Sequence, residues 1–387
     1  MSWSTVRADQ FCTLITDGTH DSPKPQQSGW KLITSKHLKG HYIDFDSANW
    51  ISEADYLKVI SRSAVEQWDI LFSMIGTIGN IYLEKNPHVE YACKNMGIFK
   101  FSGNKENALW MYYYLRSPQA KAYIQTHLRG STQAYVPLGG LREMPVPVPP
   151  QTVRNEIIAI LRPIDEKIEC NNAINDNLMQ QAVAIFKSWF VEYSPFDGIA
   201  PKEWKTVNLE KITALICRGI APKYSDNSNQ TVINQKCIRD HMIDLSQART
   251  HTPKVINEKW LRFGDLLINS TGDGTLGRTA QVWFQPQNIT VDSHVTIVRP
   301  AKENLIFYIG LWGILHEREI ECLHTGSTGQ TELPKERVKA LELHLPDNGT
   351  LDRFNTLIAP MAAAIISKQN ENNKLATLRD ALLPKLM

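Results

Sequence analysis

The stretch that decides the fold is QTVRNEIIAILRPIDEKIECNNAINDNLMQQAVAIFKSWFVEY, residues 151–193. Its apolar residues recur at alternating steps of three and four, which is the heptad pattern of a helix that buries one narrow stripe. Pro163 is expected to start or to kink the long part of this helix. The stripe, which we call the seam, comprises Ile157, Leu161, Ile164, Ile168, Asn171, Asn175, Leu178, Ala182, Ile185 and Trp189.

The same register returns 197 positions later, at the end of the chain. It passes through Phe354, Ile358, Met361, Ile365, Lys368, Asn372, Leu375, Arg379, Leu382 and Leu386. An apolar stripe must be covered, and the obvious cover for each helix is its own repeat. We therefore expect an antiparallel two-helix coiled coil about a pseudo-two-fold axis. Polar residues occupy the middle of the seam, at Asn171, Asn175, Lys368 and Asn372. They either fix the register of the two helices at some cost in stability or are solvated because the helices separate there.

The segments around these helices repeat as well. Lys36–Asp44 shares four of nine residues with Lys236–Asp244, and Trp68–Phe72 corresponds to Gly264–Ile268. Both copies alternate short β-branched and aromatic runs with Gly, Pro, Asn and Ser clusters, which is typical of a mixed α/β (α+β) domain. The predicted organisation is a first globular domain at 1–150, a helical spacer at 151–200, a second domain at 201–346 and a C-terminal helix at 347–387, with one globular domain at each end of the coiled coil.

The composition is that of an ordinary globular protein, with 42 Lys and Arg against 40 Asp and Glu in 387 residues. Neither globular segment is basic enough to bind a polyanion by charge alone. We find no membrane-spanning run and no secretory signal, and we expect a cytoplasmic protein. The six cysteines are far apart and lack a C-x-x-C pair, so we expect reduced thiols.

The motif that most resembles a catalytic one is Gly272–Thr279, which satisfies G-x-G-x-x-G and, with Arg278 in place of lysine, the P-loop pattern. Both motifs need a helix next, because the phosphate sits on N–H groups at a helix N-terminus. Thr279–Pro286 is instead an aromatic and β-branched run, so we expect a glycine-rich turn and a strand. We find no metal-ligand spacing and no compelling nucleophile and base, and therefore expect no catalytic residue and no metal site.

The motifs in this order resemble the specificity subunit of Type I restriction-modification enzymes. They are an Asp-Gly-Thr-His-x-Ser-Pro loop at Asp17–Pro23, a Gly-Asp-Leu-Leu strand with a glycine turn at Gly264–Gly277, a Gly-Ser-Thr-Gln loop at Gly130–Gln133, and the run Pro145–Pro150 before the long helix. The likeness covers the whole chain. Three departures stand out: Trp68 replaces the glycine of the strand motif, the second half lacks the Asp-Gly-Thr-His signature, and Thr325–Gln330 carries the additional Gly329.

The resemblance implies a subunit that is not itself catalytic and carries no cofactor. Its two target recognition domains would each contact one part of a split sequence in double-stranded DNA, while the helices set the spacer and dock two methyltransferase subunits. Those subunits would bind S-adenosylmethionine and methylate adenine. Two restriction and translocase subunits using ATP and Mg would complete the complex, which has no membrane partner. The helix from Ile164 to Phe190 would form a rod of about 40 Å, close to one turn of B-DNA.

The candidate DNA-contacting residues are donor-rich side chains in equivalent loops of the two halves. In the first domain they are Thr19, His20, Lys24, Lys36, Arg129, Ser131 and Gln133, and in the second they are Arg218, Lys223, Tyr224, Lys236, Arg278, Ser327 and Gln330. Two alternatives stay open at this point. One is a nucleotide-binding enzyme built on Gly272–Thr279, and the other is a coiled-coil adaptor that does not touch DNA.

Overall fold

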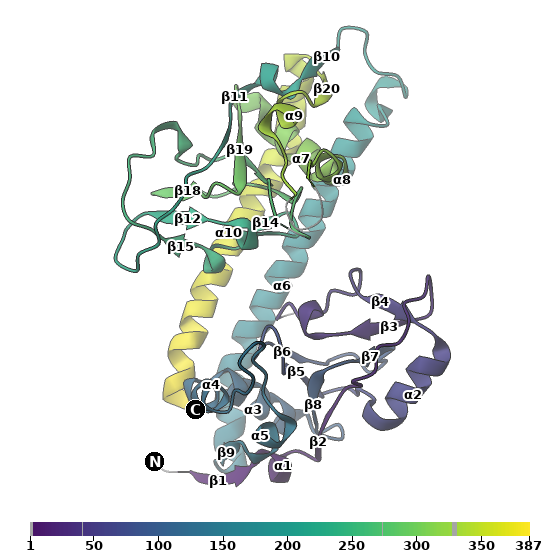
Figure 1. The fold of residues 1–387 in the computed structure, drawn as a ribbon, viewed down its shortest axis with the longest axis vertical. Coiled ribbons are helices and arrows are strands. Elements are labelled where there is room, and N and C mark those ends of the chain that lie inside the picture. The colour runs from purple at the N-terminus through teal and green to yellow at the C-terminus, as the bar shows by residue number, and fades with distance from the viewer. Residues whose placement is uncertain (1–2, 41, 273, 327–330) are drawn as a thin grey trace. The chain divides into compact units, whose positions relative to one another are not determined.

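Two long helices, α6 (Gln151–Phe190) and α10 (Asn348–Leu386), join two α/β domains (Figure 1). The computed structural model describes residues 3–40, 42–272, 274–326 and 331–387. The chain forms two compact units, Met1–Cys170 with Glu371–Met387, and Asn171–Asn370. Each unit therefore contains one α/β domain, one half of α6 and one half of α10.

The domain of the first unit is built on a four-stranded antiparallel sheet in the order β2-β8-β5-β6, with β8 and β5 in the interior. A three-stranded sheet, β4-β3-β7, contains the parallel pair β3 and β7, and β1 pairs with β9. The elements are β1 (Ser4–Arg7), α1 (Ala8–Phe11), β2 (Leu14–Asp17), β3 (Trp30–Ile33), β4 (Asn49–Ile51), α2 (Glu53–Ser63), β5 (Ile70–Ser73), β6 (Ile81–Leu83), β7 (Tyr91–Cys93), β8 (Met96–Lys100), α3 (Lys105–Arg116), α4 (Pro118–Thr126), α5 (Leu138–Glu143) and β9 (Pro145–Val148).

The domain of the second unit repeats this topology. Its sheets run β11-β19-β16-β17, β15-β12-β18 and β10-β20, and a small pair, β13-β14, is added. The elements are β10 (Lys205–Asn208), β11 (Thr213–Arg218), β12 (Thr231–Ile233), β13 (Ile238–Arg239), β14 (Met242–Ile243), β15 (Arg249–Thr250), β16 (Leu266–Asn269), β17 (Thr279–Gln281), β18 (Ile289–Val291), β19 (Val295–Pro300), α7 (Ile306–Leu315), α8 (Glu317–Cys322), α9 (Lys335–Lys339) and β20 (Glu342–Leu345). The predicted duplication of an α/β domain is confirmed.

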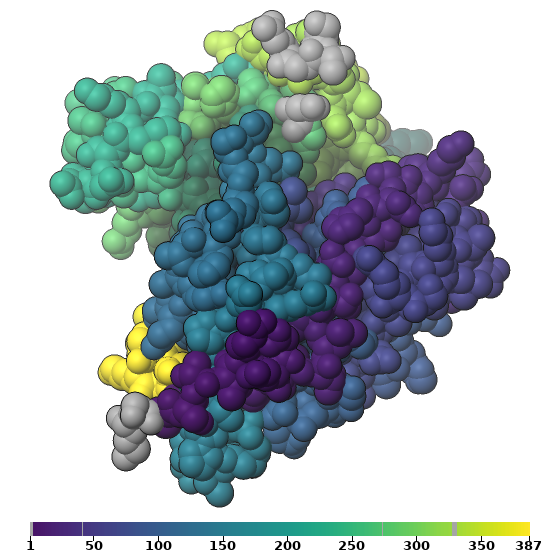
Figure 2. All heavy atoms as spheres, turned by 60° about the horizontal axis from the view of Figure 1, so that its bottom comes forward, coloured from purple at the N-terminus to yellow at the C-terminus, as the bar shows by residue number. Residues whose placement is uncertain are grey.

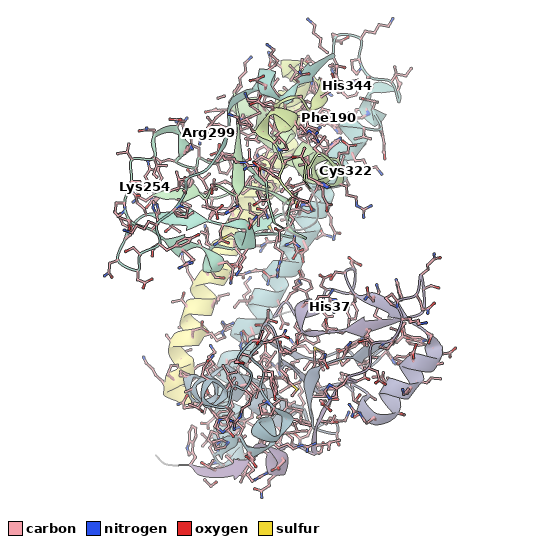
Figure 3. All side chains as sticks on the ribbon, in the orientation of Figure 1. His37, Phe190, Lys254, Arg299, Cys322 and His344 are labelled. Carbon is pink, nitrogen blue, oxygen red and sulfur yellow. The ribbon has the colours of Figure 1, made fainter. Side chains whose placement is uncertain are left out.

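The aspartate of the strand motif has a structural role in both domains. Asp69 binds the ammonium group of Lys100 at 2.9 Å, and Asp265 binds the guanidinium group of Arg299 through two contacts of 2.8 and 2.7 Å. All four groups come from the central sheet or the turn before it, and Arg299 lies in the interior of its domain (Figure 3). A buried carboxylate needs such a partner, so the motif holds β5 to β8 and β16 to β19.

The turn before this aspartate also has the same backbone conformation in both domains. Gly264 has a φ of +90° and Trp68, which replaces it in the first half, has a φ of +73°. A left-handed backbone strains any residue with a Cβ atom, and the indole of Trp68 gains a compensating contact because Lys105 lies 4.8 Å from its ring.

Within each unit the halves of α6 and α10 run antiparallel, as predicted. In the first unit Asp165 on α6 binds Arg379 on α10 at 2.9 Å, and Lys167 faces Glu371 at 3.7 Å. In the second unit the ring of Phe354 lies 4.8 Å from that of Phe190, which is labelled on α6 in Figure 3. Higher numbers on α6 thus meet lower numbers on α10.

The end of α10 also packs on the core of the first domain. Leu383 is buried there, and Trp3, Leu382 and Leu386 border the same core. Figure 2 shows this end of α10 in yellow beside the first strand in purple.

The predicted seam residues are all shielded from solvent to some degree. Ile365, Asn171 and Asn175 are buried. The half-buried ones are Ile164, Ile168, Leu178, Ile185, Trp189, Met361, Lys368, Asn372, Leu375, Arg379, Leu382 and Leu386. In the second unit the rings of Phe186 and Phe190 on α6 are buried, whereas the predicted Ile185 and Trp189, one position before them, are half-buried. A helix turns every 3.6 residues, so its buried stripe drifts from a strict 3.5-residue repeat.

The extents of α6 and α10 agree with the stretches, 151–193 and 347–387, in which the sequence pattern predicted helix. Pro163 lies inside α6, so of the two expectations for this residue, a start or a kink of the long part of the helix, the start is wrong. Because α6 contains 40 residues, it is about 60 Å long, and the part from Ile164 to Phe190 accounts for about 40 Å of this length.

Candidate nucleic-acid interface

Three loops of the first domain meet at one end of its sheets. Ile75 and Tyr135 form a β-bridge, and Tyr135 exchanges two backbone hydrogen bonds with Arg129. The hydroxyl of Thr77 donates to the carbonyl of Ser35 at 3.3 Å. The loops that carry Lys36, the glycine turn after β5, and the segment from residue 129 to 135 therefore form one cluster.

The second domain brings the equivalent loops together through the same kinds of contact. Thr271 and Thr325 each form a β-bridge with Glu332, and the amide of Gln235 donates to the hydroxyl of Thr271 at 2.7 Å. The backbone N–H of Leu333 donates to Ser270, as Val136 does to Met74 in the first domain. The duplicated backbone framework thus holds loops whose side chains differ.

A fourth loop joins each cluster at a glycine that allows close backbone approach. A Cβ atom on Gly18 would lie 2.3 Å from the carbonyl oxygen of Cys93, and one on Gly219 would lie 2.0 Å from that of Val291. Parallel bridges, Thr19 with Lys94 and Ile220 with Asp292, follow these contacts directly. The glycine of the Asp-Gly-Thr-His motif is therefore required by packing.

Equivalent short turns present Lys36 and Lys236. The imidazole Nδ1 of His37 accepts a hydrogen bond from the backbone N–H of Thr34 at 2.8 Å, and the Sγ atom of Cys237 accepts one from Asn234 at 3.4 Å. Burial lowers the pKa of His37 to about 4, so its ring is neutral at physiological pH and can act as this acceptor (Figure 3).

Eight of the predicted contact residues have exposed side chains that form no hydrogen bond or ion pair with the described part of the chain. They are Lys24, Lys36, Arg129, Ser131, Gln133, Lys223, Tyr224 and Lys236. The guanidinium of Arg249 stacks on the ring of Tyr224 at 3.7 Å, which the sequence did not indicate. Ser327 and Gln330 lie outside the described residues.

Four other predicted residues already have partners within the protein. His20 contacts Asn95 Oδ1 through Nδ1 and Asp17 Oδ2 through Nε2, each at 2.9 Å. The hydroxyl of Thr19 accepts from the backbone N–H of Asp21.

The two arginines among these four are held in the second domain. Arg218 binds Glu332 at 2.7 Å and the carbonyl of Leu333 at 2.8 Å, and Arg278 donates to the carbonyl of Gly274 at 2.8 Å. These contacts position the loops of the interface.

The described residues of the glycine-rich segment, 272 and 274–278, form a turn that leads into β17, as the sequence predicted. Gly272, Gly274 and Gly277 all have positive φ angles. A nucleotide-binding loop needs the N-terminus of a helix after it, and a strand that begins at Thr279 cannot supply one. Among the described residues no group of His, Cys, Asp and Glu side chains could hold a metal ion.

None of the helices in the described ranges is long and apolar enough to cross a membrane.

Comparison with known proteins gives a consistent result. Residues 3–180 match the family model of the Type I restriction modification DNA specificity domain. The chain is 25% identical over 384 residues to the Type I restriction enzyme MjaIX specificity subunit of Methanocaldococcus jannaschii, covering 92% of this chain and 85% of that subunit. It is also 25% identical over 177 residues to the HindI specificity subunit of Haemophilus influenzae, covering 45% of this chain and 39% of that one.

Among solved structures, the S subunit of a Type I restriction-modification system from M. genitalium aligns with a TM-score of 0.55 at 14% identity. The alignment covers 100% of this chain and 96% of that one, so the likeness in fold includes both α/β domains.

Proposed function

Because this chain belongs to the family of Type I restriction-modification DNA specificity subunits, which are non-catalytic and carry no cofactor, we propose that each of its domains reads one half of a split DNA target. The observation that carries this proposal is the duplicated loop framework with unlike side chains. A repeated backbone scaffold suits two sites with the same task, and different side chains suit two different half-sites.

The helices supply the second part of the proposal. α6 is continuous through residues of both compact units, and it pairs antiparallel with α10 in each. We propose that the length of these helices sets the unspecified spacer between the two half-sites. We also propose that they dock two methyltransferase subunits, which bring S-adenosylmethionine, and that two restriction and translocase subunits bring ATP and Mg. Since the substrate is DNA, we expect the complex to act in the cytoplasm.

The modest net charge of +2 agrees with this division of labour. A protein that binds DNA mainly through its phosphates needs many exposed Lys and Arg side chains, because their contacts with phosphates supply most of the free energy of nonspecific binding. The exposed Lys24, Lys36, Lys223 and Lys236 provide a few such contacts in the loops. We therefore expect weak DNA binding by this chain alone and tight binding once the methyltransferase subunits clamp the duplex.

Gel shifts at several salt concentrations test the proposal, with and without the methyltransferase subunits, on target and scrambled duplexes. The variant Lys236→Ala should weaken binding to all sequences and flatten the salt dependence by about one phosphate contact, whereas Lys205→Ala on β10, away from the loops, should not. The variant Arg278→Ala should cost about 1–3 kcal/mol at one base position if its guanidinium turns from Gly274 to a base. Equal binding of target and scrambled DNA by the complete complex would contradict the proposal.

A further inference from the structure

We infer that Asn95 and His294 are equivalent specificity-determining residues, each of which reads the edge of one purine in its own half-site. The inference rests on the proposed function and adds the residue and the base class to it. Neither residue belongs to a sequence motif that pointed to DNA.

The strand registers establish that the two residues are equivalent. Ser73 on β5 pairs with Met96 on β8, and Asn269 on β16 pairs with Val295 on β19. Asn95 and His294 directly precede Met96 and Val295. Each residue therefore stands at the start of an interior strand, since β8 lies between β2 and β5 and β19 lies between β11 and β16. A reading residue needs such a rigid support, because a base edge is distinguished by hydrogen bonds that tolerate little displacement.

Both positions lie where the loops of the cluster meet. The backbone N–H of Asn95 donates to the carbonyl of Thr19 at 3.1 Å, which ties it to the Asp-Gly-Thr-His loop. In the second domain the N–H of Ser270 donates to the carbonyl of His294 at 2.8 Å, which ties it to the glycine turn. The exposed lysines of the proposed interface are carried by the loops that surround these points.

Each side chain is held on one edge and has hydrogen-bonding atoms left on the other. Oδ1 of Asn95 contacts Nδ1 of His20 at 2.9 Å, and the opposite nitrogen of His20 contacts Asp17. The Nδ2 group of Asn95, with two N–H donors, meets no acceptor among the described residues. An asparagine amide presents a donor beside an acceptor with a second lone pair, and this arrangement matches N7 and N6 of adenine.

His294 is exposed and is oriented in the same manner. Its Nδ1 lies 2.7 Å from the hydroxyl of Thr271, which Gln235 holds from the other side at 2.7 Å. The second ring nitrogen, Nε2, has no partner in the described part of the chain. A ring N–H at this position can donate to N7 of a purine in the major groove. His20, with both nitrogens engaged, is by contrast a positioning residue for Asn95.

The test uses the complete chain assembled with its methyltransferase subunits and a pool of duplexes with randomised bases, bound DNA being sequenced. The variant Asn95→Ala should lose preference at one position of the first half-site, and His294→Ala at one position of the second, each by on the order of 10- to 100-fold. His88→Ala and Gln287→Ala are matched controls, because they lie in exposed loops before β7 and β18, at the ends of these strands away from the cluster. They should leave every position unchanged.

A second variant separates reading from folding. Asn95→Asp retains an acceptor for His20 but removes the amide donors, so it should shift the preferred base from adenine toward cytosine, whose N4 group donates. Unchanged base preferences in all three variants, or an equal loss of binding to all sequences, would overturn the inference. The proposed function would still stand in that case if the wild-type complex selects a split motif. No split motif for the wild-type complex would overturn the proposed function itself.

Discussion

Removing one carboxylate from the first unit should destabilise it strongly. Asp165 on α6 accepts from Arg116 on α3 at 2.7 Å and from Arg379 on α10 at 2.9 Å, and 11%, 22% and 13% of these side chains are exposed, respectively. The carboxylate thus joins the domain to both helices. The variant Asp165→Ala leaves two guanidinium groups together without their shared partner.

The expected loss of stability is estimated from the burial of the three side chains, and the second unit supplies the control. Breaking a fully buried ion pair costs roughly 3–5 kcal/mol, and the residual exposure of the arginines reduces this to about 2–4 kcal/mol. The repeat offers a matched control, because the positions equivalent to Asp165 and Arg379 are the buried Ala362 and Ala182. Leu315 occupies the place of Arg116 at the end of α7.

The triple variant Arg116→Leu, Asp165→Ala, Arg379→Ala copies that apolar arrangement and should recover most of the loss, because replacing a whole buried ion cluster by apolar groups is often neutral. Hydrogen exchange of the amides in α3 and in the last turns of α10 reports the opening free energy of this unit. If Asp165→Ala changes it by less than about 0.5 kcal/mol, or if the triple variant is as unstable as the single one, the triad has no such role.

Three further predictions concern other parts of the chain. The variant Gly18→Ala should lower the denaturation midpoint because its Cβ atom would meet Cys93, whereas Gly139→Ala, with open space around it, should not. Asn175→Pro should cost about 3 kcal/mol or more by breaking α6, and native mass spectrometry should show lost assembly with the methyltransferase subunits; normal assembly would contradict the role of the helix. The carboxylate of Glu317, whose Oε2 lies 3.3 Å from Nδ1 of His241, raises the pKa of this histidine above 6.5. Although burial opposes it, the same ion pair lowers the pKa of Glu317 below 4.5. The pair should therefore contribute fully to the free energy of unfolding between about pH 4.5 and 6.5, and this contribution should be lost as pH rises through the raised pKa of His241. The melting temperature of the wild type should fall more steeply from pH 6 to 8.5 than that of Glu317→Gln, and an equal fall would refute the prediction.

The helices and the repeat could be predicted from sequence because they depend on periodicity and spacing alone. Apolar residues at alternating steps of three and four predicted the two helices α6 and α10. Because the same pattern recurs at a constant offset, it also predicted that the two helices pair. The sequence placed Ile185 and Trp189 on the seam, but Phe186 and Phe190 are buried more deeply, because an uncoiled helix drifts and the second domain packs on its flank.

The roles of single loop residues could not be predicted in this way. His20 and Arg218 looked like DNA contacts because they are donors in polar loops, but their partners Asn95 and Glu332 lie 75 and 114 residues away in the chain. Such contacts exist only once the strands have paired. A signal for Asn95 and His294 was nevertheless present, since aligning the two repeats at the strands β8 and β19 places them at the same position.

The most direct test of the central claim is the map of N6-methyladenine in DNA from cells that express this chain with its methyltransferase subunits. Two unlike reading domains held by one pair of helices predict two different short blocks of specified bases, separated by a constant number of unspecified ones, with one methylated adenine on each strand. A single uninterrupted motif, or two blocks separated by a variable distance, would contradict the account.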